Sequence, residues 1–210
     1  MRLILLGAPG AGKGTQAEIL SMKLNVATIS TGNILRAAIR SGTQIGRMAM
    51  EYIEKGDLVP DEIIIGILKE GIQKFGSPEG YILDGVPRTI AQAEIMEDEG
   101  IIIDKALSIE IDDETIIDRM SGRRTCKNCS ASYHILHNPP KAKGVCDKCG
   151  GILELRTDDE PETVIRRLGH YHRETEPLKA YYQERGKLVS VENRPTVAET
   201  TAEILKVLGL

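Results

Sequence analysis

A glycine-rich segment near the start of the chain has the residue types of a phosphate-binding loop. It reads Gly7-Ala8-Pro9-Gly10-Ala11-Gly12-Lys13-Gly14-Thr15. Glycines let backbone N–H groups turn toward a polyphosphate, and a helix that begins after the loop adds the positive end of its dipole. The Lys13 ammonium can reach terminal phosphates, and the Thr15 hydroxyl can approach a magnesium ion. We therefore predict that this segment binds the phosphates of a nucleotide.

The loop departs from the general pattern at one position. Gly14 stands where the pattern has Ser or Thr, and the hydroxyl of Thr15 comes one residue later. The alternative interpretation is a tight glycine turn between a strand and a helix, which the flanking residues and Lys13 disfavour. Loops of this kind occur in proteins of many activities, so the loop indicates a phosphate donor and leaves the acceptor open.

The four cysteines form two close pairs separated by sixteen residues, Cys126-x2-Cys129 and Cys146-x2-Cys149. Two CxxC turns at such a distance are typical of structural zinc sites. Four thiolates complete a tetrahedron and leave no open position, so we expect the zinc to be structural. The alternatives are two disulfides or four idle thiols.

Four histidines have weaker signals. His134 and His137 lie between the cysteine pairs, and we expect surface or packing roles for them because four thiolates already complete the metal site. His170 and His172 lie on a charged helical segment, where we expect surface residues.

Five short apolar runs have the length and flanks of buried strands. They span Leu3–Leu6, Val26–Ile29, Tyr81–Leu83, Lys105–Ile111 and Leu188–Val191. Helical segments alternate with them at about 14–24, 31–41, 44–55, 90–97, 114–120 and 198–207. A further helical segment opens at Pro60-Asp61 and carries Ile63, Ile64, Ile67 and Leu68. This alternation implies a mostly parallel sheet with helices on both faces. We therefore predict an α/β fold of the P-loop type with a parallel five-stranded sheet.

Two segments interrupt the alternation and divide the chain. Residues 30–59 hold two consecutive helical segments, which we expect to form a small helical insert. Residues 123–160 hold all four cysteines and no helical period. So long a segment without regular structure is usually a functional lid, or a small module that is stabilised by its own metal site or cross-link. The core domain is then expected from residues 1–29, 60–122 and 161–210.

The composition indicates a soluble globular protein. The 210 residues are 41% hydrophobic and 28% charged, with no Trp and one Phe, so the core must be aliphatic. A net charge of -4 without a basic tail disfavours a protein that mainly holds nucleic acid. No apolar stretch is long enough to span a membrane, and the apolar start is too short for a signal peptide. We expect a cytoplasmic monomer with no nucleic-acid or membrane partner.

Further blocks place an arginine beside a glycine-bearing turn, where its planar fork can bind phosphate oxygens. Together with the loop, these blocks make the chain similar to the adenylate kinases from Met1 to about Leu208. The matching blocks are GAPGAGKGTQA, STGNILR, LDGVPRT, DRMSGRR, RTDD and a late helix with Arg166-Arg167. The segment with the four cysteines resembles the zinc-bearing lid of one branch of this family.

The resemblance implies a role for each matching position. ATP binding is implied for Gly10, Ala11, Gly12, Lys13, Gly14, Thr15, Arg119, Arg123, Ser132, Tyr133 and Pro195. AMP binding is implied for Thr31, Arg36, Asp57, Leu58, Val59, Gly85, Val86, Pro87, Arg88, Gln92, Arg156 and Arg167. The implied catalytic set is Lys13, Asp84, Arg88, Arg123, Arg156 and Arg167. Asp84 would hold magnesium through water, and Asp158 and Asp159 would brace the lid arginines.

Two positions depart from the pattern of the family. Asn33 stands where the family usually has Asp, which removes a carboxylate near the phosphates. Val86 stands where the family usually has an aromatic residue, which is expected to thin the packing against the acceptor base. Neither change removes a residue expected to bind phosphate.

The implied activity is reversible, magnesium-dependent transfer of a phosphoryl group from ATP to AMP to give two ADP. The chemistry is consistent with the residues, because phosphoryl transfer needs in-line positioning, positive charge and exclusion of water. One alternative is a kinase for another nucleoside monophosphate, which the residues facing the base would decide. Another is a zinc-ribbon protein that binds nucleic acid or a protein partner and uses ATP as a switch. The second alternative requires a basic, aromatic-bearing face near the ribbon.

Overall fold

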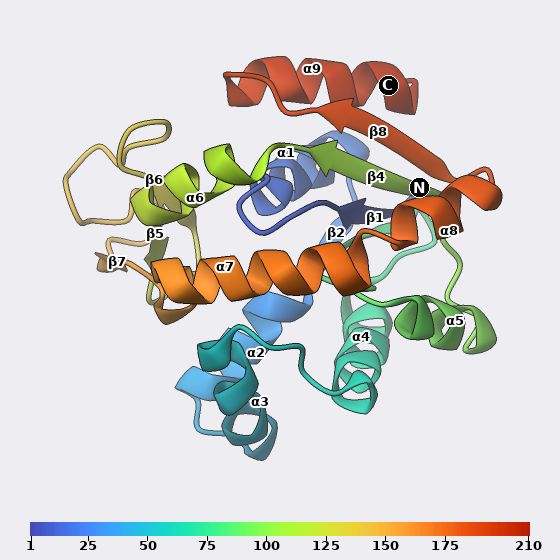
Figure 1. Ribbon diagram of the computed structural model, residues 1–210, viewed down its shortest axis with the longest axis horizontal. Helices are drawn as coiled ribbons and strands as arrows, with labels where there is room; N and C mark the ends of the chain where they lie inside the picture. The colour runs from blue at the N-terminus through green and yellow to red at the C-terminus, as the bar shows by residue number, and fades with distance from the viewer.

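The computed structural model describes all of residues 1–210. Its centre is a sheet of five parallel strands in the order β2-β3-β1-β4-β8 (Figure 1). These strands are β1 (Arg2–Leu6), β2 (Ala27–Ser30), β3 (Tyr81–Asp84), β4 (Lys105–Glu110) and β8 (Leu188–Glu192). The predicted α/β fold with a parallel five-stranded sheet is therefore confirmed.

Helices cover both faces of this sheet because alternate residues of each strand point to opposite sides. Leu3 and Leu5 of β1 pack with α1 (Lys13–Leu24) and α9 (Val197–Leu208). Ile4 and Leu6 belong to the cluster on the other face, to which α4 (Asp61–Phe75), α5 (Ile90–Asp98) and α8 (Leu178–Glu184) contribute. The core is mainly aliphatic, with Tyr81, Tyr181 and Tyr182 as the aromatic members of its largest cluster, and the single Phe75 is 50% exposed.

The helical insert consists of α2 (Thr31–Arg40) and α3 (Gln44–Lys55), which lie below the sheet in Figure 1. The Ser30 and Thr43 hydroxyls accept hydrogen bonds from the first turns of the two helices, which fixes where each begins. Gly46 lies against the backbone of Ala38, where a Cβ atom would come within 2.2 Å of the carbonyl oxygen. A side chain at this position would force the two helices apart.

The lid contains a small antiparallel sheet in the order β6-β5-β7. Its strands are β5 (Arg123–Cys126), β6 (Ser132–His134) and β7 (Leu153–Glu154), and a 3-10 turn, η1 (Thr157–Asp159), follows. The expectation of a lid segment without regular structure is therefore wrong. Strands of two to four residues are too short to produce a recognisable alternation in the sequence.

A long helical stretch passes between the lid and the insert (Figure 1). It comprises α7 (Pro161–His170) and a π-helical segment, η2 (Tyr171–Thr175), and leads into α8. The remaining helix, α6 (Asp113–Gly122), packs beside α7 through Ile116, Met120, Val164 and Leu168. This packing places the basic residues of α6 and α7 on the side of the molecule that carries the lid.

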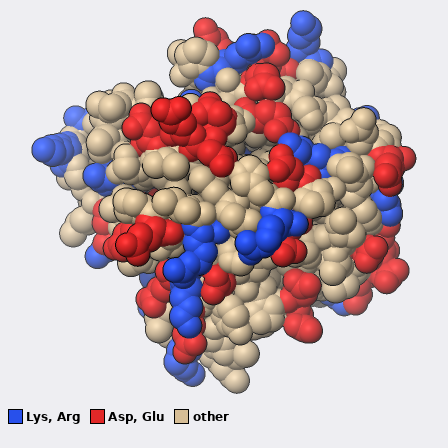
Figure 2. Space-filling model, viewed as in Figure 1, with Lys and Arg blue, Asp and Glu red and all other residues tan.

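Acidic and basic side chains are interspersed over the face seen in Figure 2. The ion pairs of the structure include Lys179 with Glu110 and Arg185 with Glu97. None of the helices combines the length and the apolar character that crossing a bilayer requires.

Candidate active site

A cleft of about 1360 Å³ extends between the core, the insert and the lid. Most of the residues implied for nucleotide binding line it, although they come from distant parts of the chain. From the core and lid these are Gly10, Gly12, Lys13, Gly14, Thr15, Asp84, Arg119, Arg123, Ser132, Tyr133, Arg156, Asp158, Arg167 and Pro195. From the acceptor side they are Thr31, Arg36, Asp57, Leu58, Val59, Gly85, Pro87, Arg88 and Gln92.

The phosphate loop connects β1 to α1 at the carboxyl end of the sheet. Gly10 and Gly12 adopt left-handed backbone conformations, with φ of 84° and 92°, which residues with a Cβ atom rarely adopt. The Lys13 ammonium donates to the carbonyl oxygens of Gly7 and Ala8 at 2.7 and 2.8 Å. Its head group is therefore held over the loop, at the amino end of α1, where anions bind favourably.

The surroundings of Lys13 disfavour the charged form of its own ammonium group. The pKa of its ammonium is lowered to about 8, chiefly by burial and in addition by the charges of Arg88, Arg167 and Arg123, while the Asp84 carboxylate opposes the shift. A bound polyphosphate would remove this penalty, because an anion next to the ammonium favours its charged form.

Asp84, at the end of β3, faces the phosphate loop. Its Oδ2 accepts a hydrogen bond from the Ser30 hydroxyl at 3.2 Å and lies 3.8 Å from where a Cβ atom on Gly14 would stand. A carboxylate with a hydroxyl beside it, next to a phosphate loop, is a donor set of the oxygen type that magnesium prefers. The residues present therefore fit a magnesium ion that enters with a nucleotide.

Three arginines converge on the cleft from the lid and from α7. Arg123 donates from Nε to Asp159 at 2.7 Å, and Arg156 donates from Nε to Asp158 at 2.8 Å. Arg167 contacts both carboxylates, at 2.9 Å to Asp158 and 3.2 Å to Asp159. The two carboxylates thus hold three guanidinium groups in one cluster across the junction of lid and core.

Charge in this cluster is only partly balanced. Burial would raise the pKa of Asp158, but Arg167 and Arg156 outweigh it and hold that pKa below its usual range. Burial lowers the pKa of Arg36 to about 9, with Arg156 adding to the effect. The Nε atom of Arg36 is buried and has no hydrogen-bond partner. An unpaired buried donor beside surplus positive charge indicates a site for an anion.

Asn33 contacts one of the expected phosphate ligands directly. Its Oδ1 accepts from the Arg36 guanidinium at 2.7 Å. Because the amide is neutral, it orients the guanidinium without cancelling its charge. With asparagine in place of aspartate, the positive charge of Arg36 is therefore not neutralised by its neighbour and stays available to an anionic ligand. The hydrogen bond still orients the guanidinium.

The acceptor side is arranged by hydrogen bonds within the protein. Gln92 is 1% exposed, accepts from the Arg88 backbone N–H and donates to Asp61, both at 2.7 Å. Arg88 also donates from Nε to the Gly85 carbonyl at 3.0 Å. Gln92 therefore positions Arg88, and its amide retains only one N–H for the expected contact with an acceptor base.

Val86 does not line the cleft. Its side chain is 1% exposed and packs in the hydrophobic core on the insert side of the sheet. The expectation that a small residue here thins the packing against an acceptor base is wrong, because the side chain points into the core. Ala11 and Asp159 are likewise buried, at 0% and 2% exposure, and lie behind the cleft.

On the donor side, the two expected lid residues differ in exposure. Ser132 is exposed in β6 and lines the cleft. Tyr133 is 7% exposed and packs with Cys126, Cys146 and Leu153, and its hydroxyl accepts from the Asp147 N–H at 2.8 Å. The Tyr133 side chain therefore contributes mainly to the interior of the lid.

The four cysteine sulfurs lie within 4.8 Å of one another. Two separations join the pairs, 3.4 Å from the Cys126 sulfur to that of Cys149 and 3.5 Å from the Cys129 sulfur to that of Cys146. A disulfide requires about 2.05 Å, whereas sulfurs around a tetrahedral zinc at about 2.3 Å are separated by roughly 3.8 Å. All four cysteines are free, and the donor set fits a structural zinc ion.

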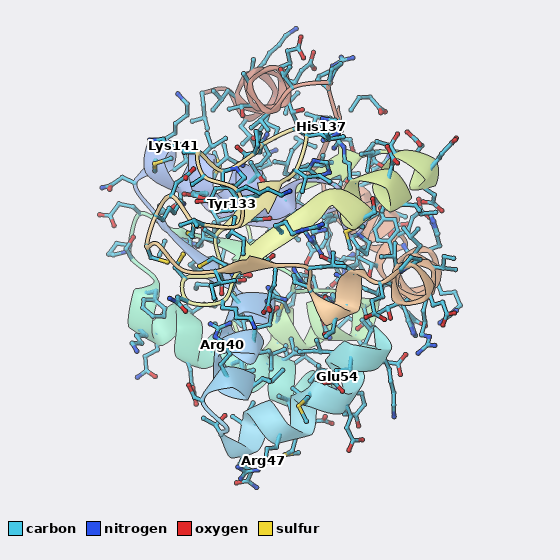
Figure 3. The ribbon with its side chains drawn as sticks, turned by 90° about the vertical axis from the view of Figure 1, so that its left-hand side faces the viewer. Arg40, Arg47, Glu54, Tyr133, His137 and Lys141 are labelled. Carbon is cyan, nitrogen blue, oxygen red and sulfur yellow. The ribbon has the colours of Figure 1, made fainter.

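The lid touches both neighbouring parts of the molecule. Lys148, inside the second CxxC turn, pairs with Glu18 of α1. Arg40 of α2 reaches Ser130 of the lid at 3.5 Å, and Figure 3 shows Arg40 at the border between lid and insert. These contacts join the lid to the core and to the insert.

Several contacting residues carried no sequence signal for the site. His170 was expected at the surface, but its Nε2 lies 3.1 Å from Asp57 and its side chain is 23% exposed. The Thr175 hydroxyl donates to the Arg88 carbonyl at 2.8 Å. Asn193 joins the phosphate loop to Arg119. Only the tertiary fold brings these residues to the cleft.

A parallel sheet with a phosphate loop at its carboxyl end, facing a wall of arginines, defines a P-loop protein that acts on nucleotide phosphates. The cations that line this cleft include Lys13, Arg36, Arg88, Arg123, Arg156 and Arg167. The carboxylates of Asp84 and Asp158 line it with them, and Asp159 lies behind, paired with Arg123.

Comparison with known proteins refines this class. A family model described as adenylate kinase matches residues 5–187. The chain is 54% identical to an adenylate kinase of Caldicellulosiruptor bescii, with all of both chains covered. It is 53% identical to one of Acetivibrio thermocellus and 46% identical to one of a Geobacillus species, over all of this chain and 98% and 99% of those proteins. The chain therefore belongs to the adenylate kinase family, and it is a nucleoside monophosphate kinase.

Proposed function

We propose that this protein transfers a phosphoryl group reversibly from MgATP to AMP to give two ADP, with a structural zinc ion in its lid. The observation that carries the proposal is one cleft lined by the phosphate loop with Lys13 and, across it, by Arg36, Arg88, Arg123, Arg156 and Arg167. Positive charge on two walls of the cleft suits an arrangement in which the terminal phosphate of the donor faces the phosphate of the acceptor.

Each wall of the cleft has a proposed role. The loop from Gly10 to Thr15 binds the donor phosphates, and Arg36 and Arg88 bind the acceptor phosphate. Arg123, Arg156 and Arg167 surround the migrating phosphoryl group. The unpaired Nε of Arg36 and the charge surplus around Arg167 support these assignments.

Bound magnesium supplies charge neutralisation between the donor phosphates. Asp84 is proposed to orient its water shell, supported by the position of this carboxylate next to Gly14. The acceptor phosphate is already a nucleophile, so no residue is assigned as a general base. The contacts of Lys148 and Arg40 support a lid that excludes water during transfer.

The other assignments are proposed with it. Residues 30–59 form the AMP-binding insert, residues 123–160 the lid, and the rest the core. Arg119 and the Pro195 backbone meet the ATP base, and Asp158 and Asp159 brace the lid arginines, supported by the ion pairs of Arg123 and Arg167. The cytoplasmic location and the monomeric state remain predictions from the sequence.

The first test mixes purified protein with magnesium, ATP and each nucleoside monophosphate in turn, and follows ADP formation. We expect rapid formation with AMP alone, lost by at least about 1000-fold in Lys13→Ala because the loop then lacks its only ammonium. Comparable rates with CMP, UMP or GMP would contradict AMP as the acceptor. Full activity after removal of magnesium would contradict the proposed dependence on this ion.

A further inference from the structure

The loop between β8 and α9 contains one residue that turns inward. Glu192 and residues 194–199 are exposed, whereas Asn193 is half-buried among them. Its backbone N–H donates to the Glu110 carbonyl at 2.8 Å, which extends the pairing of β4 with β8 by one residue. The position of Asn193 is therefore set by the sheet itself.

The rest of the loop is also held in place. The Thr200 hydroxyl accepts from the Arg194 N–H at 2.9 Å, and Thr196 with Glu199 forms a capping box at the start of α9. Because the backbone on both sides of Asn193 is anchored, its side chain leaves the sheet in a defined direction.

The Asn193 side chain joins two parts of the donor site. Its Oδ1 accepts from the Arg119 guanidinium at 2.9 Å, and its Nδ2 donates to the Ala11 carbonyl of the phosphate loop at 3.2 Å. Arg119 comes from α6, so this one amide connects three separate segments. Asn193 and Arg119 both line the cleft.

We propose that Asn193 is a positioning residue for the donor nucleotide, which holds the Arg119 guanidinium beside the phosphate loop for contact with ATP. The inference rests on the proposed function, because it takes the phosphate loop as the ATP site. An ordered guanidinium loses less side-chain freedom when the nucleotide binds, and preorganisation of this kind increases affinity.

An amide is the side chain that this position requires. It presents an acceptor to the Arg119 guanidinium and a donor to the Ala11 carbonyl, which a carboxylate cannot do. Aspartate would keep the contact with Arg119 but would lose the donor and face the carbonyl with a second oxygen. Because the amide is neutral, it also leaves the charge of Arg119 available to the nucleotide.

The test compares the native protein with Asn193→Ala, Asn193→Asp, Arg119→Ala and the double variant Arg119→Ala/Asn193→Ala. Calorimetry with MgATP alone gives the Kd without any transfer, and steady-state rates give the KM values for ATP and AMP. Glu203→Gln is the matched control, because it removes the exposed Arg194–Glu203 pair from the same loop and leaves the Asn193 contacts intact.

We expect Asn193→Ala to raise the Kd and KM for ATP about 10-fold, with the KM for AMP unchanged. Asn193→Asp should weaken ATP binding as well. The double variant should bind ATP no more weakly than Arg119→Ala, because Asn193 acts through Arg119. Glu203→Gln should match the native protein.

Additive losses in the double variant, a native Kd in Asn193→Ala or Asn193→Asp, or equal increases in both KM values would overturn the proposal. Native protein that binds MgATP but transfers nothing to AMP would contradict the proposed function. The calorimetric comparison would still decide the role of Asn193 in that case.

Discussion

The core sheet and the lid differ in how much apolar surface they bury. In the sheet, Leu3, Ile4, Ile82 and Leu107 are completely buried. In the lid, the buried cluster has only four residues, and two of them are Cys126 and Cys146. The two clusters on the faces of the sheet hold 20 and 11 buried residues. Burial of that extent stabilises a domain without a metal, but a cluster of four does not offset the entropy of ordering about forty residues.

The two regions therefore differ in what holds them together. The phosphate loop is attached to strands buried on both sides, so its geometry depends on the stability of the whole protein. The lid is proposed to depend on a zinc site and on ion pairs with its neighbours, and we expect that it can be weakened without unfolding the sheet. Three experiments can break or sharpen this contrast.

Removal of zinc should have the largest effect, and it should be confined to the lid. Structural zinc contributes on the order of 10 kcal/mol to the folding of small modules. After chelation, amide hydrogen exchange should accelerate strongly across residues 123–160, while β1 and β4 keep their protection. Restoration of zinc should restore protection. Equal loss of protection in lid and sheet would contradict a lid-specific role for the metal.

A cavity in the sheet should have the next largest effect and should act on the whole molecule. Leu107 of β4 is 0% exposed, and Leu107→Ala should reduce the free energy of unfolding by about 2–5 kcal/mol. Leu136→Ala in the lid is the matched control, because Leu136 is 75% exposed and should change stability by less than about 0.5 kcal/mol. Denaturant unfolding measures both, and similar losses for the two variants would refute the contrast.

The ion cluster at the junction of lid and core should give the smallest effect and a dependence on pH. The arginines hold the pKa of Asp158 below its usual range in the folded protein, so the unfolded chain binds more protons at this position. The resulting stabilisation is complete above the unfolded pKa of about 3.9 and is lost as the pH falls through the lower folded value.

Asp158→Asn should therefore destabilise the protein at pH 7 by on the order of 2 kcal/mol. The difference from the native protein should shrink below about pH 4, where the native carboxyl also becomes neutral in the unfolded chain. Denaturant unfolding at several pH values between 3 and 7 measures it. A difference that stays constant over this range would show that charge is not the cause.

Local patterns predicted most of the core correctly. The helix predicted at Gln44–Lys55 has the same bounds in the structure, because Thr43 caps its start and Gly56 ends it in a left-handed conformation. Strands β1, β3 and β4 were found within a residue, since their apolar runs end at glycine or charged residues. These features depend on neighbours in the sequence, where short-range signals are strongest.

The lid and the acceptor side were predicted less well. Strands β5–β7 have two to four residues each and are joined by pairing between separate segments, so their sequences carry little periodicity. The resemblance to the family implied a contact of Val86 with the acceptor base, but the side chain is packed in the core. A pattern of residue types does not specify which side of a turn a side chain occupies.

The sequence alone determined the phosphate loop, the parallel α/β fold and the spacing of a four-thiolate site, because each depends on residues close together in the chain. The tertiary structure decided which polar groups meet: Gln92 with Asp61, His170 with Asp57, and Asn193 with Ala11 and Arg119. These contacts join residues up to 182 positions apart, and a hydrogen bond forms only where packing brings donor and acceptor within about 3 Å.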